Sequence, residues 1–173
     1  MERVGGQLVY RGPAASVRMD MFKYADGETA ERQIVLVPDS VTIAAHDGET
    51  FFMVRQPREA VGEEGLLELP AGKIEDEESP LESAKRELVE EIGKQAEDWR
   101  ELKTLYLSPG YSSERATLFL ATDLKDVPTE GGDEDRLEIV QVPLAELDST
   151  ISSCEDAASV VTLLLLRELL RGA

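Results

Sequence analysis

The order of hydrophobic patterns along the sequence predicts an α+β protein, built as a mixed α/β sandwich around a mixed sheet. Segments with strand-like alternation come first, a helical pattern follows at 80–92, and further strand-like segments lead to an apolar helix at 155–171. Glycine turns such as Asp47-Gly48 separate successive strands, as is typical of hairpins. Because predicted strands both precede and follow the first helix in the sequence, we expect one sheet covered by helices.

A break at Pro38 and Asp39 divides the chain into two expected regions. Residues 1–38 are expected to form a small N-terminal antiparallel β arm that serves dimerisation, and residues 39–173 are expected to form the main domain. This boundary depends on the strand pattern alone. The expected strands are 7–11, 16–24, 32–37, 41–45, 50–56, 66–72, 101–107, 116–124 and 137–142.

The acidic composition excludes one class of function. The 173 residues include 36 acidic and 18 basic side chains, which gives a formal net charge of -18. A nucleic-acid surface needs clustered lysine and arginine, so we expect no nucleic-acid partner. A polyanionic substrate would need metal ions to offset the repulsion. Solubility, or adaptation to a salty interior, is an equally good explanation of the surface charge.

Single copies of cysteine and histidine restrict the chemistry further. Cys154 is the only cysteine, so the chain has no internal disulfide and no cysteine-rich metal site, as suits a reducing compartment. His46, the only histidine, lies in an expected turn, so we expect no Ser-His-Asp triad or histidine-rich zinc site, and acid–base chemistry falls to carboxylates. We see no signal peptide, and the apolar run 160–166 is too short to span a bilayer, so we expect a cytoplasmic protein with no membrane partner.

The helix at 80–92 carries its own start and stop signals. Ser79 is a capping residue, Pro80 suits the first helical position, and Glu82 completes a capping box. Gly93 suits the end of the helix. The apolar residues share one stripe, which we expect to face the core: Leu81, Ala84, Leu88 and Ile92.

Three glutamates crowd together beside this apolar stripe. Glu87, Glu90 and Glu91 lie within little more than one helical turn, where each pair of like charges costs roughly a few tenths of a kcal/mol. A solvated acidic face is one explanation, since charge runs are usually solvated. A bound cation is the other, because carboxylates one turn apart on one face are hard oxygen ligands of the kind that Mg²⁺ and Mn²⁺ prefer.

A longer pattern includes this helix and the residues before it. A glycine is followed after five residues by glutamate, then after seven by Arg-Glu, an aliphatic residue, any residue, Glu-Glu, any residue and glycine. The matching residues are Gly72, Glu78, Arg86, Glu87, Leu88, Glu90, Glu91 and Gly93. This pattern resembles the Nudix box of the Nudix hydrolases, and only Lys94, where the family has an aliphatic residue, departs from it. The resemblance implies a Nudix-type α/β/α sandwich and hydrolysis of a nucleoside diphosphate linked to another moiety.

The same resemblance implies that this helix binds two or three divalent ions, Mg²⁺ or Mn²⁺. Glu87 and Glu91 would be metal ligands, and Glu90 would be a ligand, a catalytic carboxylate or a support for the ligands. The carbonyl of Ala71 would complete the coordination, and Arg86 would orient the glutamates. Metal binding would relieve the repulsion among the glutamates.

Three further segments resemble the ADP-ribose pyrophosphatase branch of the family. In LSPGYSSER, Pro109 falls 16 residues after Gly93, a spacing that is similar to this branch. VRQPRE and EDAASVV resemble the same branch, although Pro57 stands where the family often has an aromatic residue. The branch implies a homodimer.

The branch also implies a set of substrate contacts. Arg55, Arg58 and Glu114 would touch the substrate, and Pro109 and Gly110 would shape the pocket for the terminal ribose. The alternative for the arginines is an ordinary surface position at a strand end, and the alternative for the glutamate is an ion pair with a neighbour.

The acidic loop GGDED is expected to supply the general base. Resemblance to the branch puts the base at Asp133, with Glu134 as the alternative because aspartate is one methylene shorter than the family's glutamate. It puts a carboxylate that touches the metal at Asp135. A solvated acidic loop is the competing explanation.

The expected activity is metal-assisted hydrolysis of ADP-ribose or a related nucleoside diphosphate sugar, giving AMP and ribose 5-phosphate. GDP-mannose, NADH or a nucleoside triphosphate is an alternative substrate within the family. A protein that senses a nucleotide without cleaving it is another alternative. The complete set of Arg86, Glu87, Glu90 and Glu91 argues against such a sensor, since a site that no longer catalyses a reaction would be expected to lose some metal ligands.

Overall fold

The computed structural model describes residues 1–128 and 136–172, and the chain divides into two compact units. The units are Met1–Asp39 with Leu105–Arg115, and Ser40–Thr104 with Ala116–Ala173. The unit that contains the N-terminal strands therefore also takes in a loop segment from the middle of the chain. The strand pattern in the sequence did not indicate this grouping.

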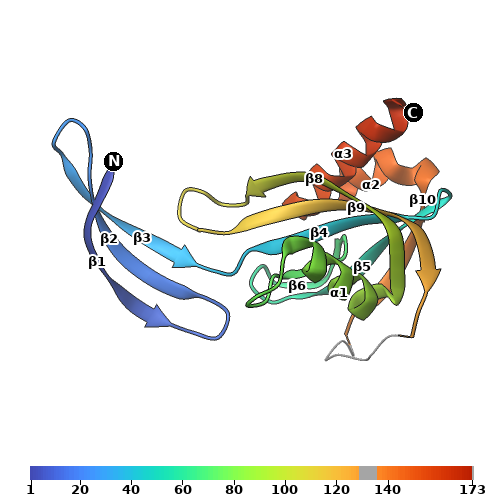
Figure 1. Ribbon diagram of the computed structural model, residues 1–173, viewed down its shortest axis with the longest axis horizontal. Coiled ribbons are helices and arrows are strands. Elements are labelled where there is room, and N and C mark those ends of the chain that lie inside the picture. The colour runs from blue at the N-terminus through green and yellow to red at the C-terminus, as the bar shows by residue number, and fades with distance from the viewer. Residues whose placement is uncertain (129–135, 173) are drawn as a thin grey trace. The chain divides into compact units, whose positions relative to one another are not determined.

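The second unit is built on a mixed sheet (Figure 1). Its strands are β4 (Ser40–His46), β5 (Thr50–Arg58), β6 (Glu63–Glu68), β7 (Ala71–Lys73), β8 (Lys94–Tyr106), β9 (Arg115–Asp126) and β10 (Glu138–Pro143). Among the described residues these seven strands have the order β10-β5-β4-β9-β8, with β6 beside β5 and β7 beside β4. Strands β4 and β9 pair in parallel, whereas β5 pairs antiparallel with β4, β6 and β10, so the predicted mixed sheet is confirmed.

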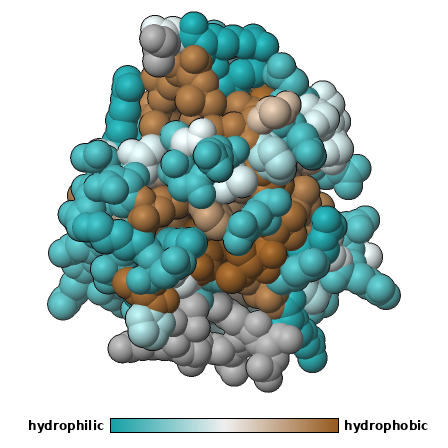
Figure 2. All heavy atoms as spheres, turned by 90° about the vertical axis from the view of Figure 1, so that its right-hand side faces the viewer, coloured by the Kyte–Doolittle hydropathy of each residue, from teal (hydrophilic) through white to brown (hydrophobic). Residues whose placement is uncertain are grey.

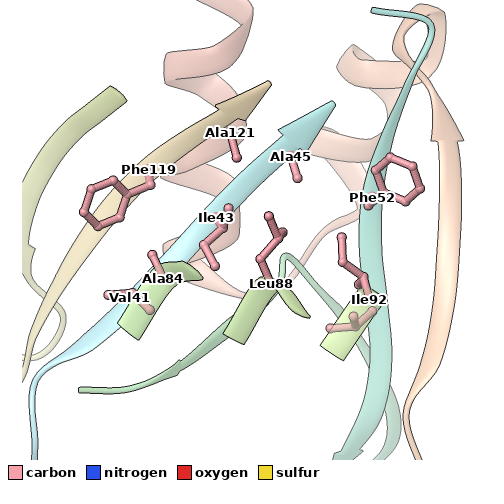
Figure 3. Packing of buried hydrophobic residues seen from close by; sticks show 10 residues of the cluster. Val41, Ile43, Ala45, Phe52, Ala84, Leu88, Ile92, Phe119 and Ala121 are labelled. Carbon is pink, nitrogen blue, oxygen red and sulfur yellow. The ribbon is translucent and has the colours of Figure 1, made fainter. Parts of the chain in front are cut away.

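Helices pack on both faces of this sheet and complete the predicted α/β/α sandwich (Figure 1). Helix α1 (Pro80–Ile92) lies on one face, and η1 (Leu144–Glu146), α2 (Leu147–Ser153) and α3 (Ala157–Gly172) lie on the other. Because side chains alternate along a strand, β4 directs Ile43 toward α1 and Ala44 toward α3, and β5 divides Phe52 and Met53 in the same way. Figure 3 shows Ile43 beside Leu88 of α1.

The capping predicted for α1 is confirmed. The side chain of Ser79 accepts a hydrogen bond from the backbone N–H of Glu82, and the Glu82 carboxylate accepts one from the backbone N–H of Ser79 at 2.8 Å. Gly93 ends the helix with a φ of 62°, in the left-handed region that favours glycine. The helix therefore begins and ends where its local signals place it.

The sequence pattern is wrong or incomplete at three places. Leu81 is 36% exposed and not part of the core, because it lies with Pro80 and Glu82 on the exposed start of α1. Strand β8 begins at Lys94, well before the expected 101. The pattern misses its first half because β8 is an edge strand, whose charged residues break the apolar alternation and discourage pairing with other chains. Helix α2 is missed because its sequence LDSTISS is rich in residues that favour turns and caps.

The first unit contains the predicted antiparallel arm. Its strands are β1 (Glu2–Arg11), β2 (Ser16–Lys23) and β3 (Thr29–Leu36), in the order β1-β2-β3. The loop segment of this unit joins β3 through backbone hydrogen bonds, because Val35 N–H donates to the Tyr111 carbonyl at 2.8 Å and Ser113 N–H donates to the Val35 carbonyl at 3.0 Å.

The described residues bury little acidic charge. Figure 2 shows one face of the molecule, on which hydrophilic residues surround apolar ones. Among the residues that the structure describes, four acidic side chains are buried: Asp20, Glu68, Glu87 and Glu91. A buried charge is costly unless it is paired and hydrogen-bonded. Each of the four therefore marks a place where the fold must supply a partner.

Asp20 joins β1 to β2. Its carboxylate is fully buried and pairs with Arg18 at 2.6 Å and with Arg3 at 2.9 Å. The Arg3 contact lacks hydrogen-bond alignment, so Oδ1 is held by charge alone. Gly6 lies opposite Asp20 in the register, and a Cβ at position 6 would lie only 2.1 Å from Oδ1. The carboxylate thus occupies the space that any other side chain at position 6 would need.

The single histidine and cysteine have structural contacts. His46 Nδ1 accepts a hydrogen bond from the backbone N–H of Gly48 at 3.2 Å, and partial burial lowers the pKa of the imidazole. Cys154 is a free, buried thiol whose pKa is raised by burial. In the described part of the chain, no helix is both long and apolar enough to cross a membrane.

We predict that Gly6→Ala loosens the first sheet and that Gly5→Ala does not. Alanine at position 6 would need a φ of 149° and would displace the Asp20 carboxylate, whereas nothing lies within 4 Å of a Cβ at position 5. We expect the free energy of local opening to fall by about 1–3 kcal/mol, measured by hydrogen exchange of the β2 amides. Equal protection in the two variants would contradict this role of Gly6.

Candidate functional site

The acidic edge of α1 combines burial with crowding. Glu87 and Glu91 are 9% and 7% exposed, and Glu90 between them is partly exposed. The helical period puts all three beside the apolar stripe that faces the sheet. The helix therefore places carboxylates at the edge of the hydrophobic core, where their negative charge must be compensated.

Arg86 supplies this compensation. Its Nη1 donates hydrogen bonds to Glu87 Oε1 at 2.7 Å and to Glu90 Oε2 at 2.9 Å. Its Nε donates to Glu78 Oε1 at 2.8 Å, and its Nη2 donates to the carbonyl of Lys73 at 3.0 Å. One guanidinium therefore fixes three carboxylates and the loop that precedes the helix.

The pKa shifts follow from these contacts. Hydrogen bonds from Arg86, with one from the backbone N–H of Glu75, lower the pKa of the Glu78 carboxyl to about 2. The hydrogen bonds to Glu78 raise the pKa of Arg86, and Glu87 and Glu90 add to the rise. Both groups therefore stay charged over the whole range in which proteins are ordinarily folded.

The backbone of residues 69–71, which leads from β6 into β7, is bound by three other elements. Strand β4 and helices α1 and α3 each contribute one hydrogen bond to it. The bonds are Leu69 N–H to Ser159 Oγ (2.8 Å), Ile43 N–H to the Pro70 carbonyl (2.8 Å) and Ala71 N–H to Glu91 Oε2 (3.0 Å). The expected metal-binding carbonyl of Ala71 thus belongs to a segment with little freedom to move.

Ser159 is a supporting residue that the sequence pattern does not reveal. It is fully buried in α3, and its own backbone N–H donates to the Asp156 carboxylate at 2.8 Å. A serine among the apolar residues of α3 is the one available signal, because a buried hydroxyl needs a partner. Its partner, Leu69, is 90 positions away in the chain, so no local pattern identifies it.

Gly72 begins the sequence motif because Glu87 leaves no room for a side chain there. A Cβ at position 72 would lie 1.9 Å from the carboxyl carbon of Glu87. The carboxylate therefore packs directly against the backbone of the loop. This contact explains why the pattern starts with glycine so far from the helix.

The donor chemistry at this edge fits a hard divalent cation. The carboxylates of Glu87, Glu90 and Glu91 and the carbonyl of Ala71 are oxygen ligands of the kind that Mg²⁺ and Mn²⁺ prefer. Within residues 1–128 and 136–172, however, no group of three or more His, Cys, Asp or Glu side chains is arranged to hold a metal. Arg86 bridges Glu87 and Glu90 through one oxygen of each carboxylate.

The residues considered for proton transfer are only partly described. The predicted base, Asp133 or Glu134, and the predicted metal contact, Asp135, lie outside the residues that the structure describes. Glu90, the other predicted catalytic carboxylate, has a side chain that is 36% exposed and is bound to Arg86. Solvent therefore reaches Glu90 more easily than it reaches Glu87.

The two predicted substrate arginines of β5 have different partners. Arg58 forms a bidentate salt bridge with the buried Glu68, with Nε to Oε1 at 2.8 Å and Nη2 to Oε2 at 2.6 Å. Arg55 Nη1 donates to the carbonyl of Gly65 at 3.0 Å, and its Nε lies 3.6 Å from Glu138. Both guanidinium groups are half-exposed, and the bidentate contact fixes Arg58 more firmly.

Pro109, Gly110 and Glu114 belong to the first unit. Pro109 and Gly110 line a cavity of about 300 Å³ within that unit. Tyr24 and Arg32 line the same cavity, and the guanidinium lies 5.9 Å from the centre of the tyrosine ring. The predicted substrate residues therefore form two groups, these three and the two arginines of the second unit.

The fold and the acidic helix together define a Nudix hydrolase. The NUDIX domain family matches residues 37–163, and the chain belongs to this family. The family that the sequence motif predicts is thus confirmed.

The chain is also similar to individual proteins of known name. The chain is 33% identical over 143 residues to the methanol dehydrogenase activator of Bacillus methanolicus, covering 81% of this chain and 77% of the relative. It is 30% identical over 155 residues to the ADP-ribose pyrophosphatase of Bacillus subtilis (strain 168), covering 88% and 83%. A crystal structure of an ADP compounds hydrolase matches with a TM-score of 0.88 at 28% identity, covering 99% and 94% of the two chains.

We predict that the contribution of Glu78 to stability disappears in acid. Its folded pKa of about 2 lies below the ordinary value of 4.5, so its stabilising effect is complete above about pH 5 and is lost as the pH falls toward 2. Urea unfolding of the wild type and of Glu78→Gln at pH 7, 4 and 3 should give a difference that shrinks in that order. A difference that does not change with pH would contradict the assignment.

Proposed function

We propose that this Nudix hydrolase cleaves the pyrophosphate bond of ADP-ribose or a related nucleoside diphosphate sugar, with two or three Mg²⁺ or Mn²⁺ ions. The observation that carries the proposal is the contact of Glu87 and Glu91 with the backbone of Gly72 and Ala71 at one edge of α1, where Arg86 also holds Glu90. Relatives named ADP-ribose pyrophosphatase and ADP compounds hydrolase support the substrate class.

The residues around the acidic edge have distinct proposed roles. Glu87, Glu91 and the Ala71 carbonyl would hold the ions, with Glu90 as a further ligand or support. When bound, the ions would neutralise the diphosphate and lower the pKa of the attacking water. Arg86 would orient the carboxylates.

A carboxylate would then take the proton of the attacking water. We assign this role to Asp133 or Glu134, with Asp135 at the metal and Glu90 as the candidate within α1. As the water oxygen bonds to one phosphorus, the bond from that phosphorus to the bridging oxygen breaks. ADP-ribose and water would therefore give AMP and ribose 5-phosphate.

The proposed substrate contacts are Arg55, Arg58 and Glu114, with Pro109 and Gly110 shaping the pocket for the terminal ribose. The half-exposed guanidinium groups on β5 support this proposal, since arginine suits phosphate oxygens. GDP-mannose, NADH and nucleoside triphosphates are the alternative substrates, and nucleotide sensing without cleavage is the alternative activity.

A substrate panel tests the proposal. The protein is incubated with Mg²⁺ and, separately, with ADP-ribose, GDP-mannose, NADH and a deoxynucleoside triphosphate, and the phosphate-containing products are followed. We expect AMP and ribose 5-phosphate from ADP-ribose, at a higher kcat/KM than for the other compounds. Tight binding of one compound without cleavage of any would favour the sensor.

Glu91→Gln tests the metal assignment in the same assay. Glutamine can still accept the hydrogen bond from Ala71 N–H, so we expect an unchanged fold by circular dichroism and no turnover. Glu97→Gln, which changes an exposed carboxylate paired with Lys125, is the matched control. Full activity of Glu91→Gln would contradict the assignment of Glu91 as a metal ligand.

We also propose that residues 1–38 form the interface of a cytoplasmic homodimer. Strand β1 is an edge strand that is exposed along its whole length. Its exposed apolar side chains include Val4, Leu8 and Val9, and an open apolar edge favours pairing with another chain. The single buried thiol, Cys154, suits a reducing cytoplasm.

Light scattering after size exclusion tests the dimer. We expect the mass of two chains for the wild type and of one chain for Val9→Glu, because a charge at this apolar position opposes the contact. A wild-type protein with the mass of one chain at micromolar concentration contradicts the proposal.

A further inference from the structure

Glu68 is a buried carboxylate that the Nudix motif does not include. It is the last residue of β6, and only 5% of it is exposed. A charged group in such a place is costly unless a counter-charge and hydrogen bonds compensate it. An apolar residue would suit a purely structural position, so the charge requires an explanation of its own.

Arg58 supplies the counter-charge in a fixed geometry. Its two parallel hydrogen bonds to Glu68, at 2.8 and 2.6 Å, are those of a bidentate pair. Gln56 Nε2 adds a hydrogen bond to Glu68 Oε2 at 3.2 Å. Since all three residues lie on the paired strands β5 and β6, the carboxylate is a rigid base for the arginine.

Arg58 retains binding capacity beyond this pair. A guanidinium carries five N–H groups, and Glu68 engages one on Nε and one on Nη2. Both N–H groups of Nη1 and the second N–H group of Nη2 are therefore not used by this carboxylate. The arginine side chain is 43% exposed, so a phosphate oxygen can approach the fork from solvent.

The surroundings of Arg58 are otherwise negative. The hydrogen bonds to Glu68 raise the pKa of Arg58, and the nearby carboxylates of Glu91 and Asp156 add to the rise. This negative charge keeps the guanidinium protonated, as phosphate binding requires.

We propose that Glu68 is a positioning residue for diphosphate binding: it fixes Arg58 with its Nη1 group available to a phosphate oxygen. This inference rests on the proposed function, since it assumes a diphosphate substrate at the acidic edge of α1. Because Glu68 acts through the position of Arg58, its loss should weaken substrate binding more than it slows the chemical step.

Steady-state kinetics of Glu68→Gln with ADP-ribose and saturating Mg²⁺ test the inference. Glutamine keeps the size of the side chain and one acceptor but removes the charge. We expect KM to rise about tenfold, as for the loss of one charge-assisted hydrogen bond, and kcat to stay within about threefold. The control Glu97→Gln removes a carboxylate from an exposed ion pair with Lys125 and should change neither constant. An unchanged KM in Glu68→Gln, with or without a lower melting temperature, overturns the inference.

A double-mutant cycle with Arg58→Lys separates positioning from a general loss of stability. Lysine keeps the charge but lacks the planar fork. If Glu68 acts through Arg58, Glu68→Gln should raise KM less than about twofold in the Arg58→Lys background. An equal rise in both backgrounds contradicts the inference. Should Glu68→Gln fail to fold, Glu68→Asp takes its place, because it keeps the charge but shifts the guanidinium by one methylene.

Failure of the proposed function can be told apart from failure of this inference. If the wild type cleaves no compound of the panel, calorimetric binding of ADP-ribose replaces the kinetics. Binding to Glu68→Gln that is about tenfold weaker than to the wild type then supports the positioning role. Equal binding to both proteins, or no binding to the wild type, overturns it.

Discussion

The contact between Arg86 and the carboxylates around it is the interaction on which the acidic edge of α1 depends. Without it, Glu87 would lose the ion pair that offsets the burial of its carboxylate. With it, the guanidinium binds Glu78, Glu87 and Glu90 and also ties the helix to the Lys73 carbonyl. The same group thus solves an electrostatic problem and fixes the loop against the helix.

Three of the four buried carboxylates in the described part of this acidic protein are paired with arginine. Asp20 has Arg3 and Arg18, Glu68 has Arg58, and Glu87 has Arg86. Arginine suits these places because its planar fork binds a carboxylate at two points and stays charged when partly buried. Other arginines pair with more exposed carboxylates, as Arg167 does with Asp148, so buried carboxylates account for only some of the arginine pairs in the described residues.

The parts of the structure that local chemistry determines are the parts that the sequence predicts. The ends of α1 follow from Ser79, Glu82 and Gly93, and the alternation along β4 and β5 follows from burial on both faces of the sheet. The motif identifies the family because its spacing reflects one loop and one helix. The sequence pattern assigns the relief of glutamate repulsion to a metal, whereas Arg86 already provides relief in the structure. Ser159 and Glu68 escape prediction because their partners lie on other elements and no short spacing encodes them.

The hydrogen bond between Leu69 and Ser159 also bears on how the protein acquires its activity during synthesis. It joins residues 90 positions apart, so it cannot form before α3 has been synthesised and packed against the sheet. Helix α1 and its caps are local and can form early, but the loop beside the acidic edge gains its tie to α3 only at the end. A nascent chain that still lacks α3 would therefore carry the Nudix motif with one of the three hydrogen bonds to the neighbouring loop missing.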